Sequence, residues 1–293
     1  ITEITGTEDG MTYDDLVIEV TVVVTDLGNG ELGIEATYSD DIVFNNTYTA
    51  DGNWIPIVSK ALVGRVLQVD EFTFELLEGE EVLLTTTNQE DGSVIFDEIS
   101  YTQEDIGQTY DYTIREAAGT LGGVMYDDMI ITIGVEVADA GDGKLELTIT
   151  YSEDKIFNNT YEATGNWLPL VQKVLEGRDP VAGEFSFQLT QGDKVLQTKT
   201  NGADGNIPFE AIEFNAPGEY EYELVAVEGA AYAVTYDETV YTIKVVVTDN
   251  GDGTLKVVPS ITEAIVFNNS FAIPTIDVTA TKVWVSGPPV KPV

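Results

Sequence analysis

A five-residue motif that occurs three times constrains this chain more than any other feature of its sequence. Residues 44–48 and 157–161 read Phe-Asn-Asn-Thr-Tyr, and residues 267–271 read Phe-Asn-Asn-Ser-Phe. Copies that lie 113 and 110 residues apart indicate a repeated folded unit, which then explains most of the chain. In a β-strand, the second asparagine of each motif would share one face with the two flanking aromatic residues. An amide placed in such a core needs a hydrogen-bond partner or a reaction.

Further matches at the same offsets define where each repeat begins and ends. Residues 60–65 match residues 173–178, and residues 110–112 match residues 220–222. We therefore expect the chain to be a piece of a longer array of repeats. Its predicted parts are the C-terminal half of a truncated repeat at 1–50, complete repeats at 51–163 and 164–274, and the start of a following domain or a linker at 275–293.

The pattern of hydrophobic residues predicts an all-β chain. Residues 16–24 and 241–247 are rich in β-branched side chains, as strands are, and no long segment keeps a helical period. We therefore expect tandem Ig-like β-sandwich repeats. The Gly-rich turns at 26–30, 139–143 and 249–253 are interpreted as hairpins rather than calcium sites, because they lack alternating oxygen ligands and a distant glutamate.

Composition excludes several classes of function. The chain of 293 residues carries 13 basic and 52 acidic residues, a net charge of −39, so nucleic acid and anionic membrane surfaces would repel it. It has neither cysteine nor histidine, which removes disulfides, thiolate nucleophiles and the commonest general base and metal ligand. No apolar run is long enough to span a membrane, and we expect the chain to lack targeting information of its own. We expect no cofactor and no metal.

Three residues of the first complete repeat can carry chemistry: Lys60 near its start, Glu116 beyond its middle and Asn159 at its end. A buried lysine without a partner tends to lose its proton and become a nucleophile. Glu116 has the same parity as Tyr112 and Ile114, so we expect it to face inward with a raised pKa. Such a trio could join Lys60 to Asn159 as an amide, with loss of ammonia, in a dry and preorganised core. The alternative is a buried ion pair beside a satisfied amide.

These motifs resemble those of the streptococcal pilin isopeptide linkage domains, a family found in Gram-positive pilins and surface adhesins. That family carries a lysine in its first strand, a Tyr-x-Tyr-x-Ile-x-Glu strand and a terminal Phe-x-Asn-x-Tyr, and residues 110–116 and 157–161 fit the last two patterns. The resemblance covers the chain to about residue 274. It implies a sandwich whose first and last strands are joined by an autocatalytic Lys–Asn isopeptide bond, with Glu116 as the catalytic residue and the second asparagine of each pair as the reactive one.

The second complete repeat departs from the family pattern at one position. Lys173 and Asn269 are in place, but Ala226 stands where the catalytic glutamate is expected. Loss of a general acid–base group typically slows a reaction by about 10²–10⁴-fold. Glu223 lies an odd number of residues from position 226, so in a strand it would face the opposite side, and Glu228 lies two residues further along. We therefore expect Lys173 and Asn269 to lie close together and to be unlinked, or linked only slowly.

The two ends of the chain carry incomplete sets of the same residues. Glu3 and Asn46 match the motif, with Glu3 in the catalytic place, but no lysine precedes Lys60. Residues 1–50 therefore cannot close their own bond, and we expect the missing strands to lie upstream in the parent protein rather than in another chain. At the other end, residues 282–284 read Lys-Val-Trp and resemble the opening strand of collagen-adhesin B-type domains, which makes Lys282 a candidate isopeptide-forming residue.

We interpret the chain as a structural stalk or shaft segment of a Gram-positive cell-surface adhesin or pilus. A bond between first and last strands would let force pass without unzipping the strands between them. Its partners would be neighbouring repeats of the same long chain and other pilin or adhesin subunits, with any host ligand bound elsewhere in the full protein. We expect it to be extracellular, anchored to the cell wall through the parent protein, and not an enzyme beyond the single turnover of its own bond.

The alternative function is a ligand-binding adhesin module for a glycan or a host protein. Trp54 and Trp167 could stack on carbohydrate, but they occupy equivalent places in the connections between repeats. We therefore expect each tryptophan to form a stiff joint packed against a neighbouring repeat.

Overall fold

The computed structural model describes residues 1–283 and 287, and the chain divides into two compact units, Ile1–Tyr161 and Glu162–Val293. Apart from one short 3₁₀ turn, η1 (Gln103–Asp105), every regular element in the described residues is a β-strand. The all-β prediction is therefore confirmed. None of the described residues forms a helix long and apolar enough to cross a membrane.

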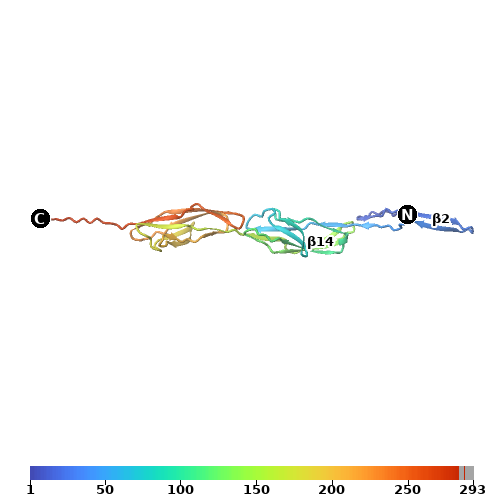
Figure 1. The fold of residues 1–293 in the computed structure, drawn as a ribbon, viewed down its shortest axis with the longest axis horizontal. Helices are drawn as coiled ribbons and strands as arrows, with labels where there is room; N and C mark the ends of the chain where they lie inside the picture. The colour runs from blue at the N-terminus through green and yellow to red at the C-terminus, as the bar shows by residue number, and fades with distance from the viewer. Residues whose placement is uncertain (284–286, 288–293) are drawn as a thin grey trace. The chain divides into compact units, whose positions relative to one another are not determined.

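The first complete repeat is a sandwich of two sheets, cyan to green in Figure 1. One sheet has the strand order β14-β13-β11-β7-β8 and the other has the order β12-β15-β6-β9. Phe74 of β7 and Phe157 of β15 meet between the sheets, with ring centroids 5.2 Å apart, and both are fully buried. The strands are β5 (Asp51–Trp54), β6 (Ile57–Val63), β7 (Thr73–Glu78), β8 (Glu81–Thr87), β9 (Ser93–Ile95), β10 (Ile99–Thr102), β11 (Thr109–Glu116), β12 (Val124–Met125), β13 (Ile130–Asp139), β14 (Leu145–Tyr151) and β15 (Ile156–Tyr161).

The second complete repeat has the same two-layer plan. Its sheets have the orders β20-β17-β26-β23 and β19-β18-β22-β24-β25, and Phe187 and Phe267 meet between them at 5.1 Å. The strands are β16 (Gly165–Trp167), β17 (Val171–Glu176), β18 (Ser186–Gln191), β19 (Lys194–Thr200), β20 (Asn206–Ile207), β21 (Ile212–Phe214), β22 (Gly218–Ala226), β23 (Val234–Thr235), β24 (Val240–Asp249), β25 (Leu255–Pro259) and β26 (Ile265–Phe271).

Residues 1–50 contain strands that correspond to the second half of a repeat. β1 (Met11–Thr12) pairs with β4 (Thr47–Tyr48), and β2 (Val20–Asp26) pairs with β3 (Leu32–Tyr38). In Figure 1 no second layer covers the hairpin that contains β2. Its apolar side chains are accordingly exposed on both strands, among them Val22, Val24, Leu32 and Ile34.

The three Gly-rich turns are hairpins, as predicted. They join β2 to β3, β13 to β14 and β24 to β25, and each of these pairs is antiparallel. In the second turn, Gly141 and Gly143 have φ values of 85° and 74°, a conformation that residues with a Cβ rarely adopt. Within the described residues, no three His, Cys, Asp or Glu side chains form a group that could hold a metal ion.

The expectation that Trp54 and Trp167 pack against a neighbouring repeat was wrong. Trp54 is buried and contacts Tyr112 and Tyr151 of its own repeat, with ring centroids 6.1 and 6.2 Å away. Trp167 packs in the same way on Tyr222, at 5.4 Å. The reason is that the segments before the prolines are strands: β5 pairs with β10 and β16 pairs with β21, which turns each indole into the core of its own repeat.

Candidate functional site

The fold of the first complete repeat brings together the three residues that the sequence singled out. Lys60 lies on β6 and Asn159 on β15, which are adjacent and parallel, with Phe157 opposite Lys60. Glu116 is the last residue of β11 in the other sheet, opposite Phe74. Its carboxylate therefore reaches across the interior of the sandwich toward the pair of parallel strands.

The Glu116 carboxylate lies between the lysine amine and the asparagine amide. Nζ of Lys60 donates to Oε2 of Glu116 at 3.0 Å, and Nδ2 of Asn159 donates to Oε1 at 2.8 Å. The Lys60 and Glu116 side chains are 0% and 1% exposed, and Asn159 is fully buried. The Lys60 amine also sits over the Phe72 ring, 4.6 Å from its centroid. Water is thus kept from the groups that could react.

Burial drives the proton from the amine toward the carboxylate. Desolvation lowers the pKa of the Lys60 amine, although the hydrogen bond and charge of Glu116 oppose this. Desolvation also raises the pKa of the Glu116 carboxyl, against the hydrogen bonds from Lys60 and Asn159. Because the two pKa values move toward each other, the site favours a neutral amine beside a carboxylic acid more than water does. A neutral amine is a nucleophile, and the acid can protonate a leaving group.

Asp127 completes the site, and the sequence reasoning gave it no role. Its backbone N–H donates to Oδ1 of Asn159 at 2.7 Å. Its own carboxylate accepts from the backbone N–H groups of Asn158 and Met129, at 2.7 and 2.9 Å. The carboxylate therefore fixes the turn that aims the N–H at the amide oxygen, where negative charge would develop during attack on the carbonyl carbon.

The same contacts recur in the other two copies of the motif. The N–H of Asp237 donates to Oδ1 of Asn269 at 2.8 Å, and that of Asp14 donates to Oδ1 of Asn46 at 2.9 Å. Both carboxylates also accept from the N–H of the preceding asparagine, at 2.7 Å in each case. The signal in the sequence is a Tyr-Asp pair, at residues 13–14, 126–127 and 236–237, that keeps the repeat offset.

In the second complete repeat, the lysine and the asparagine are in place without a carboxylate. Lys173 and Asn269 lie on the parallel neighbours β17 and β26. Lys173 is 3% exposed, and its amine donates to the backbone oxygens of Val174 and Phe267 at 2.8 and 2.9 Å. Burial lowers the pKa of Lys173 to about 8. The charges of Asp237 and Glu184 oppose this shift, but the hydrogen bonds of the amine go to backbone oxygens and not to a carboxylate.

Ala226 occupies the position that Glu116 has in the first complete repeat. It lies opposite Phe187, as Glu116 lies opposite Phe74. The two nearby glutamates do not replace the missing carboxylate, because Glu223 and Glu228 are both exposed.

At the N-terminal end of the chain, the structure brings one pair of the predicted residues together. Nδ2 of Asn46 donates to Oε1 of Glu3 at 2.6 Å, while Oε2 of Glu3 is buried without a hydrogen-bond partner. This is the arrangement of Glu116 and Asn159 without the lysine. Lys282 is exposed and lies in no strand, and most of the tail that follows it, including Trp284, lies outside the described residues. Its role in a bond stays a prediction.

Comparison with known proteins identifies one matching family. The sequence model described as FctA, Spy0128-like isopeptide containing domain, matches residues 1–49, 56–162 and 169–272. No curated protein matches the chain.

Several solved structures are similar at low sequence identity. The major pilin T-13 of Streptococcus pyogenes is 15% identical over 76% of this chain and 99% of its own, with a TM-score of 0.27. Another major pilin of Streptococcus pyogenes is 15% identical over 74% and 98%, with a TM-score of 0.28. Two B repeat units of the collagen binding protein of Staphylococcus aureus are 15% identical over 86% and 56%, with a TM-score of 0.25. Because these TM-scores are low, the assignment to a family rests on the match to the sequence model alone.

Proposed function

Because the chain belongs to the family of Spy0128-like isopeptide-containing domains, we propose that Lys60 and Asn159 form an intramolecular amide bond, with Glu116 as the acid–base group. The observation that carries this proposal is the position of the Glu116 carboxylate, which accepts hydrogen bonds from the future nucleophile and from the future leaving group at once. A buried ion pair alone would not need the third contact.

The reaction balances without a cofactor. Glu116 takes a proton from the Lys60 amine, and neutral Nζ attacks Cγ of Asn159. The N–H of Asp127 stabilises the charge on Oδ1. Glu116 then gives its proton to Nδ2, the Cγ–Nδ2 bond breaks and ammonia leaves. A second proton passes from the new amide nitrogen to Glu116, which began as a carboxylate and ends as a carboxylic acid, so that all protons are accounted for. A repeat with the complete set of residues reacts once on itself, so we propose that the chain is not an enzyme for external substrates.

The bond would make the first complete repeat a mechanically stable stalk unit of a surface adhesin or pilus. The bond closes a loop of about 100 residues and so lowers the entropy of the unfolded chain. By analogy with a disulfide of that span, this would raise the free energy of unfolding by about 4–5 kcal/mol. An amide is not reducible, and the chain has no cysteine that could do this work by a disulfide. We place the parent protein outside the cell, with neighbouring repeats and other pilin or adhesin subunits as its partners.

A ligand-binding module is the weaker candidate. The tryptophans that could have stacked on a glycan, Trp54 and Trp167, are buried. The pattern of repeats therefore favours a structural role for the described part of the chain.

Intact-mass measurement of the full chain tests the proposal. We expect a mass lower than that of the sequence by one ammonia, and a peptide map in which the Lys60 and Asn159 peptides are joined. Lys60→Ala should restore the missing ammonia, whereas Lys155→Ala, at an exposed lysine of the same repeat, should not. The full sequence mass in the unmodified chain would rule the bond out.

A further inference from the structure

A further contact between the first and last strands of the sandwich lies just beyond the reactive residues. β6 ends at Val63 and β15 ends at Tyr161. The guanidinium of Arg65 lies over the Tyr161 ring, with its Cζ atom 4.7 Å from the ring centroid. Tyr161 is buried and follows Asn159 by two residues. Arg65 therefore contacts the strand that carries the reactive amide, on the face to which that amide points.

Arg65 is held in place by Glu71. Nη1 of Arg65 donates to Oε2 of Glu71 at 3.1 Å, and Nη2 pairs with Oε1. Oε2 also accepts from the backbone N–H of Gln68 at 3.0 Å. The two side chains are only 18% and 10% exposed. A two-point contact between a guanidinium and a carboxylate fixes the orientation of both groups, so Arg65 has one defined position over the tyrosine ring.

Glu71 brings the same cluster next to the reactive lysine. Phe72, the residue that follows Glu71, is buried, and the Lys60 amine lies 4.6 Å from the centroid of its ring. The N–H of Phe72 donates to Oδ1 of the buried Asn88 at 2.8 Å, which fixes the backbone at this point. The Arg65–Glu71 pair therefore joins the ring beneath the amine to the ring at the end of the other reactive strand.

The backbone before Arg65 fits closely against the last strand. Gly64 has a φ of 109°, and a Cβ added to it would lie 2.1 Å from the carbonyl oxygen of Tyr161. Only glycine leaves room for such an approach. We call Gly64, Arg65, Glu71 and Tyr161 the arginine clasp, because together they hold the end of β6 against the end of β15.

The second complete repeat has the same clasp, formed by Gly177, Arg178, Glu184 and Phe271. Cζ of Arg178 lies 4.9 Å from the centroid of the Phe271 ring, and Nη1 donates to Oε2 of Glu184 at 3.0 Å. A Cβ added to Gly177 would lie 2.3 Å from the carbonyl oxygen of Phe271. The clasp is therefore a repeated feature of the fold rather than a local accident of one repeat.

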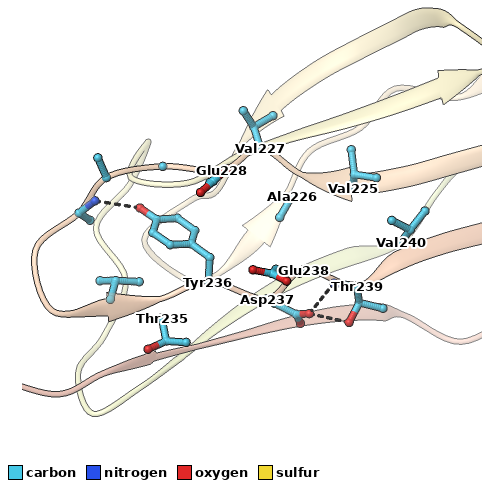
Figure 2. Close-up of a pocket in the computed structure, with 14 residues that line it drawn as sticks. Val225, Ala226, Val227, Glu228, Thr235, Tyr236, Asp237, Glu238, Thr239 and Val240 are labelled. Atoms are coloured by element: carbon cyan, nitrogen blue, oxygen red, sulfur yellow. Dashed lines mark hydrogen bonds between the residues drawn. The ribbon is translucent and has the colours of Figure 1, made fainter.

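This second clasp is present although the catalytic glutamate is missing. Ala226 borders a cavity of about 640 Å³, and Figure 2 shows Glu228, Asp237 and Glu238 among the residues that line it. Loss of the glutamate has thus not been accompanied by loss of the arginine pair. The role of the clasp is separable from proton transfer, as expected of a contact that aligns the two strands.

We propose that Arg65 is a positioning residue for the Lys60–Asn159 reaction, and that the arginine clasp holds β6 and β15 so that Nζ of Lys60 stays close to Cγ of Asn159. The inference rests on the proposed function, because it concerns the same reaction. Glu116 remains the group that moves the protons. The clasp limits the relative motion of the two strands before the bond forms, and such restriction is what accelerates an intramolecular reaction.

The experiment measures the rate of ammonia loss by intact mass while the full chain, recovered unfolded and unlinked from inclusion bodies, is refolded. We expect Arg65→Ala to link Lys60 to Asn159 about 10- to 100-fold more slowly, since a misplacement of about 1 Å can cost about 10²-fold. Arg65→Lys keeps the charge but loses the planar fork, so it should also be slow. Glu75→Gln breaks the more exposed Arg115–Glu75 pair of the same repeat and should link at the parent rate.

The comparison is made between folded proteins, because a less stable repeat would also link slowly. Circular dichroism identifies conditions in which every variant is fully folded. A merely structural role would leave the rate unchanged there, whereas a positioning role lowers it. Glu71→Gln should lower the rate by a similar factor. The double variant of Arg65→Ala with Glu71→Gln should be no slower than either single variant, because both remove the same contact.

The second clasp gives an independent test. In the Ala226→Glu variant, Arg178→Ala should slow the Lys173–Asn269 link and leave the link of the first complete repeat unchanged. If Arg65→Ala does not fold, Arg65→Lys and Glu71→Gln carry the test. Parent rates in the folded clasp variants, or equal slowing by Glu75→Gln, would refute the positioning role and leave the proposed function standing. If the parent chain loses no ammonia, both proposals fail.

Discussion

Glu116 and Asn159 come from opposite sheets of one sandwich, yet the carboxylate of the first accepts a hydrogen bond from the amide of the second at 2.8 Å. This contact exists only when the two sheets have packed. The proposed chemistry therefore depends on a folded core, and substitutions should separate the two: a residue that reacts can be removed without removing the layers of Phe74 and Phe157 that form the core.

Glu116→Gln should keep the shape and the hydrogen bond to Asn159 while removing the proton shuttle. We expect the repeat to fold and the bond to form about 10²–10⁴-fold more slowly. A time course of intact mass after refolding measures this rate. Glu116→Asp, which keeps the acid but shortens the reach, should be intermediate. A glutamine variant that reacts as fast as the parent would show that another group moves the proton.

Asp127→Ala should slow the reaction at Asn159 through loss of position rather than loss of an acid. Without its carboxylate, the turn loses the two acceptors for the N–H groups of Asn158 and Met129, so the N–H that binds Oδ1 is no longer fixed. We expect a rate at least about tenfold lower, which is less than the loss of about 10²–10³-fold when an oxyanion donor is removed outright, because the backbone N–H is still present. Asp128→Ala, at the exposed neighbour, is the matched control. Equal rates in the two variants would contradict the role given to Asp127.

Ala226→Glu should restore the site of the second complete repeat. The new carboxylate would lie opposite Phe187, within the interior between Lys173 and Asn269. We expect one further ammonia to be lost and this repeat alone to become more stable, by up to about 4–5 kcal/mol. Mass spectrometry and thermal unfolding check the two effects. Ala226→Gln, which adds the same bulk without an acid, should give neither.

The stability of the unlinked second repeat should rise with pH because of Lys173. Its pKa is about 8 in the folded state, against 10.5 for an ordinary lysine, so the folded state binds this proton less well than the unfolded state does. The penalty is complete below about pH 8 and is relieved as the pH rises toward 10.5, by about 3 kcal/mol in total. When the free energy of unfolding is measured with denaturant at a series of pH values, it should therefore rise more steeply with pH in the parent than in Lys173→Met over this range. If the free energy of unfolding depended on pH identically in the two proteins, burial of the charged Lys173 amine would not destabilise the fold.

The hairpin of β2 and β3 should be the least protected part of residues 1–161. Its apolar side chains, such as Val22 and Ile34, are exposed, so packing adds little to its stability. Hydrogen exchange should be much faster there than in the equivalent hairpin of β13 and β14, where Ile131 and Val135 are buried. Equal protection in the two hairpins would show that residues 1–50 bury their apolar face in solution.

The sequence predicted most of the site because alternate residues of a strand face the same side, and because equivalent residues of the repeats keep a constant spacing. The alternation that placed Glu116 with Tyr112 and Ile114 holds, since all three are buried, and the repeat offset located Ala226. It could not show that the segments before the prolines are strands, so the direction of Trp54 was wrong. It also missed Asp127, because the group that contacts Asn159 is its backbone N–H, which every residue except proline has, and its carboxylate only fixes the turn.

The register of β15 has a consequence for the order of events during folding. Asn158 and Asn159 point to opposite faces, so a slip of one residue would turn the reactive amide outward and put its neighbour inward. Until the amide bond forms, such a slip can be corrected at no chemical cost. Once the proposed bond had formed, ammonia would have left, and Lys60, which lies opposite Phe157 in the parallel pair, would be tethered to Asn159. Bond formation would thus make the strand pairing irreversible, and only repeats whose first and last strands had met in the correct register would become linked.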